Sequence, residues 1–117
     1  MNIEFFRDYC LAKPGVTEEF PFDADTLVFK VMKKMFALTD VDLFESVNLK
    51  CDPEKAMELR EANAGIKPGF HMNKKHWNTV ETNGMVNDNQ IKELIDHSYS
   101  LVAHGLTKAA KEELKNL

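Results

Sequence analysis

Two strand-like runs, TLVFKV (residues 26–31) and MFALT (residues 35–39), decide the fold class of this chain. In the first run, apolar residues at alternate positions share one face of an extended strand. Lys33 and Lys34 lie at or near the connection between the runs. We therefore predict a β-hairpin here, and the absence of glycine leaves its turn type open.

Further strands and one helix are expected on either side of the hairpin. The run SVNLKC (residues 46–51) alternates as a third strand, and residues 77–81 and 19–22 read as two shorter ones. Asp52 supplies a capping oxygen for a helix over residues 53–62, whose first position is a proline. The central part of the chain is therefore predicted to be mostly strand.

Helical segments are expected at both chain ends. Asn2 caps a helix that runs to about residue 12. Asn87 and Gln90 form a capping box that begins a long amphipathic helix, and Thr107 caps a last one. An antiparallel sheet with such helices covering a face gives a single two-layer α+β domain over residues 1–117, with about five strands.

The composition is that of an ordinary globular protein. The chain has 117 residues, of which 44% are hydrophobic and 29% charged. The N-terminal residues mix charge into the apolar positions and do not resemble an export signal, and no apolar run is long enough to span a membrane. We therefore expect a cytoplasmic monomer whose two cysteines, Cys10 and Cys51, are reduced and buried.

The charge distribution is more informative than the net charge of −4. A negative net charge argues against a general nucleic-acid binder, whose binding surface is usually basic. Two stretches, residues 26–39 and 62–80, nevertheless contain lysines and no acidic residue. They contribute Lys30, Lys33, Lys34, Lys67, Lys74 and Lys75, together with His71 and His76.

Several runs, in order along nearly the whole chain, resemble the YjbR/MmcQ family. The longest is PGFHMNKKHWNTV (residues 68–80), and shorter ones are EFPF at 19–22, LVFKV at 27–31, MFAL at 35–38, NLKCDPE at 48–54, SY at 98–99 and LV at 101–102. The resemblance implies a frataxin-like (CyaY-like) fold and DNA binding through two β "wings", and it assigns no catalytic residues. Met32-Lys33 stand where the family often has glycines.

The candidate nucleic-acid site combines both basic stretches. Ammonium and imidazole groups contact phosphates, and an indole can stack on a base. The proposed site residues are Lys30, Lys33, Lys34, Lys67, His71, Asn73, Lys74, Lys75, His76 and Trp77. The structural alternative is that Trp77 is part of the core, that His71 and Asn73 bond to loop backbone, and that the lysines are only solvated.

Neither a metal site nor a catalytic site is predicted. His71 and His76 would face opposite ways on a strand, so they would not converge on a metal. Ser98, Thr79 and Cys51 are nucleophiles with no definable base beside them. We therefore expect a binding protein rather than an enzyme, with no cofactor.

The leading hypothesis is a nucleic-acid-binding module with weak, salt-dependent affinity for DNA. A first alternative is a small-molecule-binding or accessory enzyme domain, with a pocket lined by His71, Asn73, His76, Trp77 and Asn78. A third hypothesis is a protein-interaction adaptor. A deep pocket near Trp77 would favour the first alternative, and an exposed basic face would favour nucleic acid.

Overall fold

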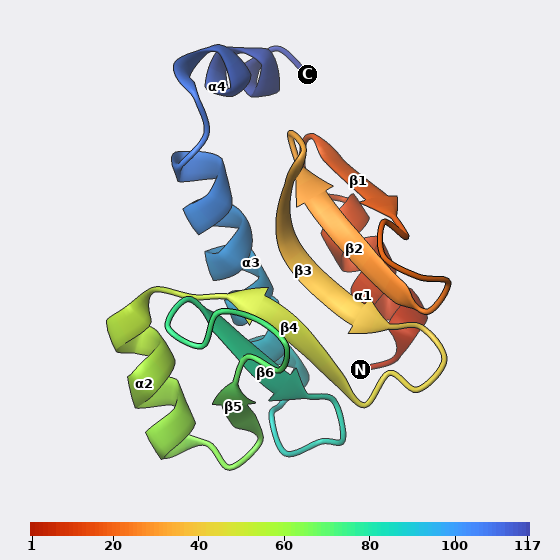
Figure 1. Cartoon of the computed structure of the whole chain (residues 1–117), viewed down its shortest axis with the longest axis vertical. Helices are drawn as coiled ribbons and strands as arrows, with labels where there is room; N and C mark the ends of the chain where they lie inside the picture. The colour runs from red at the N-terminus through yellow and green to blue at the C-terminus, as the bar shows by residue number, and fades with distance from the viewer.

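The computed structural model describes residues 1–117 and contains one six-stranded sheet and four helices (Figure 1). Along the chain the elements are α1 (Ile3–Leu11), β1 (Val16–Glu19), β2 (Thr26–Val31), β3 (Lys34–Asp40), β4 (Ser46–Lys50), α2 (Pro53–Ala62), β5 (Ile66–Pro68), β6 (Trp77–Glu81), α3 (Asp88–His104) and α4 (Lys108–Lys115). The strand order is β1-β2-β3-β4-β6-β5, and every pairing is antiparallel. The predicted α+β class is confirmed, with six strands in place of about five.

Each helix begins where the sequence predicts it. The side chains of Asn2, Asp52, Asn87 and Thr107 each accept a hydrogen bond from the backbone N–H three residues later. These bonds satisfy N–H groups that have no partner within the helix. Local side-chain chemistry therefore sets the helix starts.

The two faces of the sheet differ. Helices α1 and α3 pack on one face, where Phe6 and Cys10 from α1 and Ile95 from α3 join the main core with Phe29 and other strand residues. The opposite face carries only a small buried cluster of Val28, Leu38 and Trp77, with Met35 and Met72 packed against it. We call this second face, which no helix covers, the open face.

The β2–β3 connection is a two-residue turn formed by Met32 and Lys33. Both residues have positive φ, at 47° and 72°. This is the backbone of a type I′ hairpin turn, which matches the twist of the strands but is normally built with Asn or Gly. The hairpin therefore forms without glycine, at some conformational cost.

One expected strand boundary was wrong, and one strand was not predicted. The brief strand expected at residues 19–22 lies earlier, at Val16–Glu19, and residues 20–25 form a loop that contains Pro21. A proline has no N–H to donate to a strand partner, so pairing ends before it. The three-residue strand β5 is too short for alternation to indicate it.

A side chain of α3 forms hydrogen bonds with backbone groups at a β-bulge in β3. The register between β2 and β3 shifts so that Phe36 and Ala37 are both in the main core. Ser98 of α3 is fully buried, donates a hydrogen bond to the Phe36 carbonyl and accepts one from the Lys50 N–H at 2.9 Å. This serine therefore serves backbone groups near the bulge and is part of the structure.

Both cysteines are free and buried, as predicted. Burial raises the pKa of Cys10 to about 12, and it also raises the pKa of Cys51. These thiols are therefore poor nucleophiles at neutral pH. None of the four helices combines the length and apolar content that crossing a bilayer requires.

Candidate functional site

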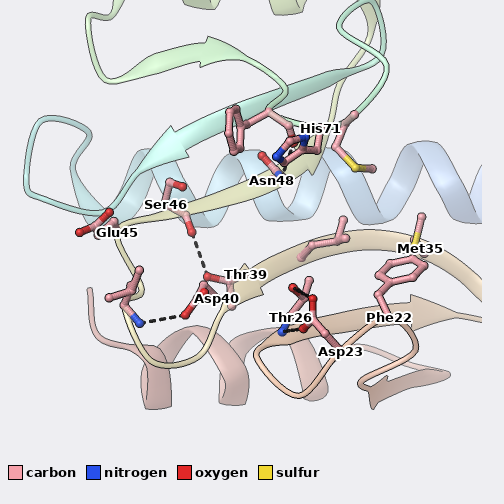
Figure 2. Close-up of a pocket in the computed structure, with 14 residues that line it drawn as sticks. Phe22, Asp23, Thr26, Met35, Thr39, Asp40, Glu45, Ser46, Asn48 and His71 are labelled. Carbon is pink, nitrogen blue, oxygen red and sulfur yellow. Dashed lines mark hydrogen bonds between the residues drawn. The ribbon is translucent and has the colours of Figure 1, made fainter.

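A cavity of about 500 Å³ lies on the open face, between the loop before β2 and the β5–β6 loop. Figure 2 shows Phe22 on the β2 side of it and His71 on the β5–β6 side, with Asn48 and Met35 between them. Its apolar lining consists of Phe22, Met35, Leu38, Leu43, Phe70 and Met72. Its polar lining consists of Asp23, Thr26, Thr39, Asp40, Glu45, Ser46, Asn48 and His71.

The sheet positions the floor of the cavity. Thr26 pairs with Asp40 across β2 and β3, and Leu38 pairs with Asn48 across β3 and β4. Cross-strand partners point to the same side of a sheet, so these side chains all face away from α1 and α3. The alternation that buries one set of strand residues in the core therefore presents the other set to the cavity.

The wall formed by the β5–β6 loop is held by two polar side chains of the open face. Thr79 accepts a hydrogen bond from the Phe70 N–H at 2.8 Å and donates one to the Asn48 carboxamide oxygen. The Asn48 amide nitrogen donates to the Phe70 carbonyl at 3.4 Å. Both backbone groups of Phe70 are thus fixed to the sheet.

Arg60 and Gly69 fix the rest of this loop. The Arg60 guanidinium donates to the Asn78 side-chain oxygen at 2.7 Å, to the Trp77 carbonyl at 3.2 Å and to the Lys74 carbonyl. A Cβ on Gly69 would lie 2.7 Å from the Trp77 Cβ, so only glycine permits this approach. The loop therefore has a defined backbone position.

The rim of the cavity is apolar and unusually exposed. Phe22, Phe70 and Leu43 are 65%, 65% and 66% exposed, although all three line the cavity. His71 has a φ of 59°, and its ring lies 4.1 Å from that of Phe70. A left-handed backbone at a non-glycine residue is costly, and such strain is frequent at binding sites.

Two carboxylates of the lining are held by backbone N–H groups. Asp23 Oδ1 accepts from the N–H groups of Asp25 and Thr26, and these bonds lower the pKa of Asp23. Asp40 Oδ1 accepts from the N–H groups of Asp42 and Leu43, both at 2.9 Å. These hydrogen bonds give both carboxylates a fixed orientation.

The candidate lysines fall into two groups. Lys30 is ion-paired with Glu19, Lys67 is ion-paired with Glu81, and Lys74 donates to the Gly69 carbonyl at 3.1 Å. The side chains of Lys33, Lys34 and Lys75 are exposed and have no hydrogen-bond or ion-pair partner. Only the second group is free to meet a phosphate.

These free lysines lie at one end of the sheet. The β2–β3 turn, the end of β4 and the start of β6 share this end, because β3 pairs antiparallel with β4 and β4 with β6. A groove there is lined by Lys34, Lys50 and Trp77, among others. We call this region, with Lys33, Lys34, Lys50, Lys74 and Lys75, the lysine-rich end.

The other candidates are mostly structural. Trp77 is only 8% exposed and packs with Val28 and Leu38, so its ring cannot stack on a base. The Asn73 side-chain oxygen accepts from the backbone N–H groups of Lys75 and His76. Of the five residues expected to line a pocket, His71 lines the cavity, whereas Asn73, His76, Trp77 and Asn78 do not.

Sequence reasoning missed most of the cavity. Its floor comes from strand residues such as Thr26, Ser46 and Asn48, which the sequence analysis did not single out as candidate site residues. Two signals were available: polar residues at alternate strand positions, and phenylalanines in loops, at Phe22 and Phe70. No group of three or more His, Cys, Asp or Glu side chains is arranged to hold a metal ion.

Known proteins resemble this chain over its whole length. The family model described as YjbR matches residues 11–101. The chain is 35% identical over 118 residues to the uncharacterized protein YjbR of Escherichia coli K12, with full coverage of both chains. It is also 35% identical to the uncharacterized protein YbdF of Escherichia coli O157:H7, covering 96% of this chain and 93% of that one.

A solved structure agrees with these matches. The crystal structure of Deinococcus radiodurans protein DR2400, which contains a DUF419 domain, has a TM-score of 0.91 and 44% sequence identity. The match covers 97% of this chain and 88% of that one. The family, the fold and the sheet that carries the cavity are therefore shared, and the chain belongs to the YjbR family.

Proposed function

We propose that this protein is a small-molecule-binding module whose site is the cavity on the open face. The observation that carries the proposal is a concave, partly open site of about 500 Å³ with a polar floor and an exposed aromatic rim. Cavities of roughly 300–1,000 Å³ are typical of small-molecule sites. The loop fixed by Asn48, Thr79 and Arg60 gives such a site a defined wall.

The exposed rim supports this function over a purely structural role. Phe22, Leu43 and Phe70 come from three separate loop segments and meet around one cavity. Each of these side chains exposes apolar surface, and burying such surface is favourable by roughly 25 cal/mol per Å². A ligand that covers this rim would recover part of that free energy.

A cavity-filling variant tests the proposal. Ser46 lines the floor with a half-buried side chain that forms no hydrogen bond, so Ser46→Trp should fill the cavity and leave the sheet intact. Ser100→Trp on the exposed side of α3 is the matched control. A screen of aromatic fragments by amide NMR shifts should perturb the cavity residues in the wild type and the control but not in Ser46→Trp.

Two results would reject cavity binding. One is a fragment screen in which no compound shifts the amides of residues 70–72 in the wild-type protein. The other is a set of shifts that persists unchanged in Ser46→Trp, because the compounds would then bind elsewhere.

Nucleic-acid binding at the lysine-rich end is a second candidate. Its support is that Lys33, Lys34 and Lys75 are unpaired and lie at the same end of the sheet. The net charge of −4 and the buried Trp77 limit the expected affinity to micromolar or weaker. Lys30 and Lys67 are expected to contribute little, because glutamates already neutralise them.

The salt dependence of binding distinguishes free from paired lysines. Each phosphate neutralised on duplex DNA contributes a slope of about −0.9 to a plot of log affinity against log salt. Replacing Lys34 and Lys75 with alanine should therefore flatten the slope by about two units, whereas Lys67→Ala should leave it unchanged. The measurement is fluorescence anisotropy with labelled single- and double-stranded DNA. Absence of binding at high micromolar protein would eliminate this candidate.

A further inference from the structure

The charges around the cavity indicate which class of molecule it accepts. Three carboxylates, from Asp23, Asp40 and Glu45, belong to its lining, and no lysine or arginine does. None of the three forms an ion pair. His71 is the one basic side chain of the lining. The cavity is therefore negatively charged at neutral pH.

Neighbouring lysines do not cancel this charge. Lys30 and Lys67 face the same side of the sheet as the cavity floor, but Glu19 and Glu81 neutralise them. The free lysines are at the opposite end of the strands from Asp23 and Asp40. The lysines nearest the cavity floor are thus already ion-paired, and the lining itself contains no lysine or arginine.

The titration of a neighbouring carboxyl group agrees with a negative potential. The pKa of Asp25 is raised, chiefly by a hydrogen bond with Asp42 and by the charge of Asp42, then by desolvation, and to a smaller extent by the charges of Asp40 and Asp23. Like charges disfavour the ionised form of a carboxyl group. The acidic side chains at this end of the sheet therefore repel one another.

The aromatic rim also favours a cationic ligand. Phe22 and Phe70 are exposed aromatic side chains of the lining, and the face of an aromatic ring attracts a cation. The cavity and its aromatic rim define the binding site, and the carboxylates determine which charge of ligand the site prefers. An anionic ligand would be repelled by the carboxylates of the lining, and the lining has no lysine or arginine with which it could form an ion pair.

We propose that the cavity binds an organic cation, namely a protonated amine or quaternary ammonium carried on an apolar body. This inference rests on the proposed small-molecule function and specifies its ligand class. The apolar body contacts Met35, Leu38 and the aromatic rim, and the cationic group lies near Asp40 and Glu45. The backbone N–H groups that hold Asp23 and Asp40 orient these carboxylates before a ligand arrives.

Three probes with the same aromatic body separate charge from shape. They are 1-naphthylmethylammonium, 1-naphthylmethanol and 1-naphthylacetate, each titrated into the full chain at neutral pH and followed by amide NMR shifts. We expect the ammonium to bind about tenfold more tightly than the alcohol, and the acetate to bind most weakly. Raising the ionic strength from about 0.01 M to about 1 M should reduce the advantage of the ammonium, because the Debye length falls from about 30 Å to about 3 Å.

Charge-removing variants assign the effect to the cavity. Glu45→Gln and Asp40→Asn keep the side-chain shape. Asparagine also keeps an oxygen that can accept the two backbone hydrogen bonds that Asp40 accepts in the wild type. Each should weaken binding of the ammonium much more than binding of the alcohol, so that the ammonium-to-alcohol affinity ratio falls severalfold. Glu112→Gln on α4, outside the cavity, is the control and should leave the ratio as in the wild type.

The outcomes separate this inference from the proposed function. If the alcohol or the acetate shifts the cavity amides at least as strongly as the ammonium, the cation preference is wrong and the binding cavity stands. If none of the three probes shifts these amides at millimolar concentration, the binding function fails and the cation preference with it. A ratio that survives both charge-removing variants also overturns the inference.

Discussion

One serine hydroxyl joins three elements of the fold. Ser98 of α3 reaches the sheet at the place where the bulge in β3 ends its pairing with β4. It contacts the Phe36 carbonyl and the Lys50 N–H, two backbone groups that would otherwise lack a partner. Buried backbone groups without partners are costly, so this hydroxyl has a structural rather than a chemical role.

Removing this hydroxyl should weaken the fold measurably. We expect Ser98→Ala to lower the free energy of unfolding by about 2–3 kcal/mol, because both backbone groups lose a buried partner. Ser100→Ala, two residues away and exposed, should change it by less than about 0.5 kcal/mol. Urea denaturation followed by circular dichroism measures both. Equal effects of the two substitutions would contradict the structural role of Ser98.

At the scale of elements, the β2–β3 turn carries strain that its sequence does not relieve. Met32 and Lys33 adopt left-handed backbone conformations that cost most residues roughly 1–2 kcal/mol each. Glycine adopts the same conformation freely. The pairing of the two long, buried strands on either side of the turn stabilises the hairpin despite this cost.

Substituting glycine in this turn should have opposite effects at adjacent positions. We expect Lys33→Gly to raise the free energy of unfolding by about 0.5–1 kcal/mol by relieving the strain at positive φ. Lys34→Gly, one residue later within β3, should lower it by a similar amount, because glycine weakens a strand. Both remove one lysine charge, so a comparison of their thermal unfolding isolates the backbone effect. Destabilisation by Lys33→Gly would contradict the type I′ assignment.

An element can be predicted from sequence when the interactions that form it lie between residues close together in the chain. The four helix starts were predictable because each depends on a cap within three residues. Strand β5 and the true position of β1 were not, since they exist through pairing with β6 and β2. The cavity depends on residues far apart in the chain, such as Phe22 and His71, so only its basic and aromatic segments could be singled out.

Across the whole molecule, the order of the strands separates charge. The acidic loops before β2 and after β3 meet at one end of the sheet, and the lysine-rich segments meet at the other. Two basic stretches were visible in the sequence, but their position relative to the acidic loops follows from the antiparallel topology. The net charge of −4 therefore conceals two ends of opposite character.

The stability of the whole fold should depend on pH through His97. Its Nε2 accepts a hydrogen bond from the Asp52 N–H at 3.2 Å, which requires a neutral ring. Burial and the nearby Lys55 lower the pKa of His97 in the folded state. A histidine with a lowered folded-state pKa binds its proton more readily when unfolded. Stability should therefore decrease as pH falls from the unfolded value of about 6.5 through the lowered folded-state pKa.

The matched variants are His97→Gln and His104→Gln. Glutamine can accept the Asp52 N–H without titrating, so His97→Gln should flatten the loss of stability between about pH 7 and pH 5. His104 is exposed and forms no side-chain hydrogen bond, so its substitution should preserve the wild-type profile. Urea denaturation at a series of pH values gives the comparison. An unchanged profile in His97→Gln would refute this assignment.

The edges of the sheet have a consequence for the behaviour of the protein at high concentration. Its outer strands, β1 and β5, are only four and three residues long. The first carries Glu18 and Glu19, and the second ends in Pro68, which offers no N–H to another chain. Neither edge is a template for the strand-by-strand growth that produces fibrils, so the long, buried β2 and β3 are shielded from aggregation by short, charged or proline-ended neighbours.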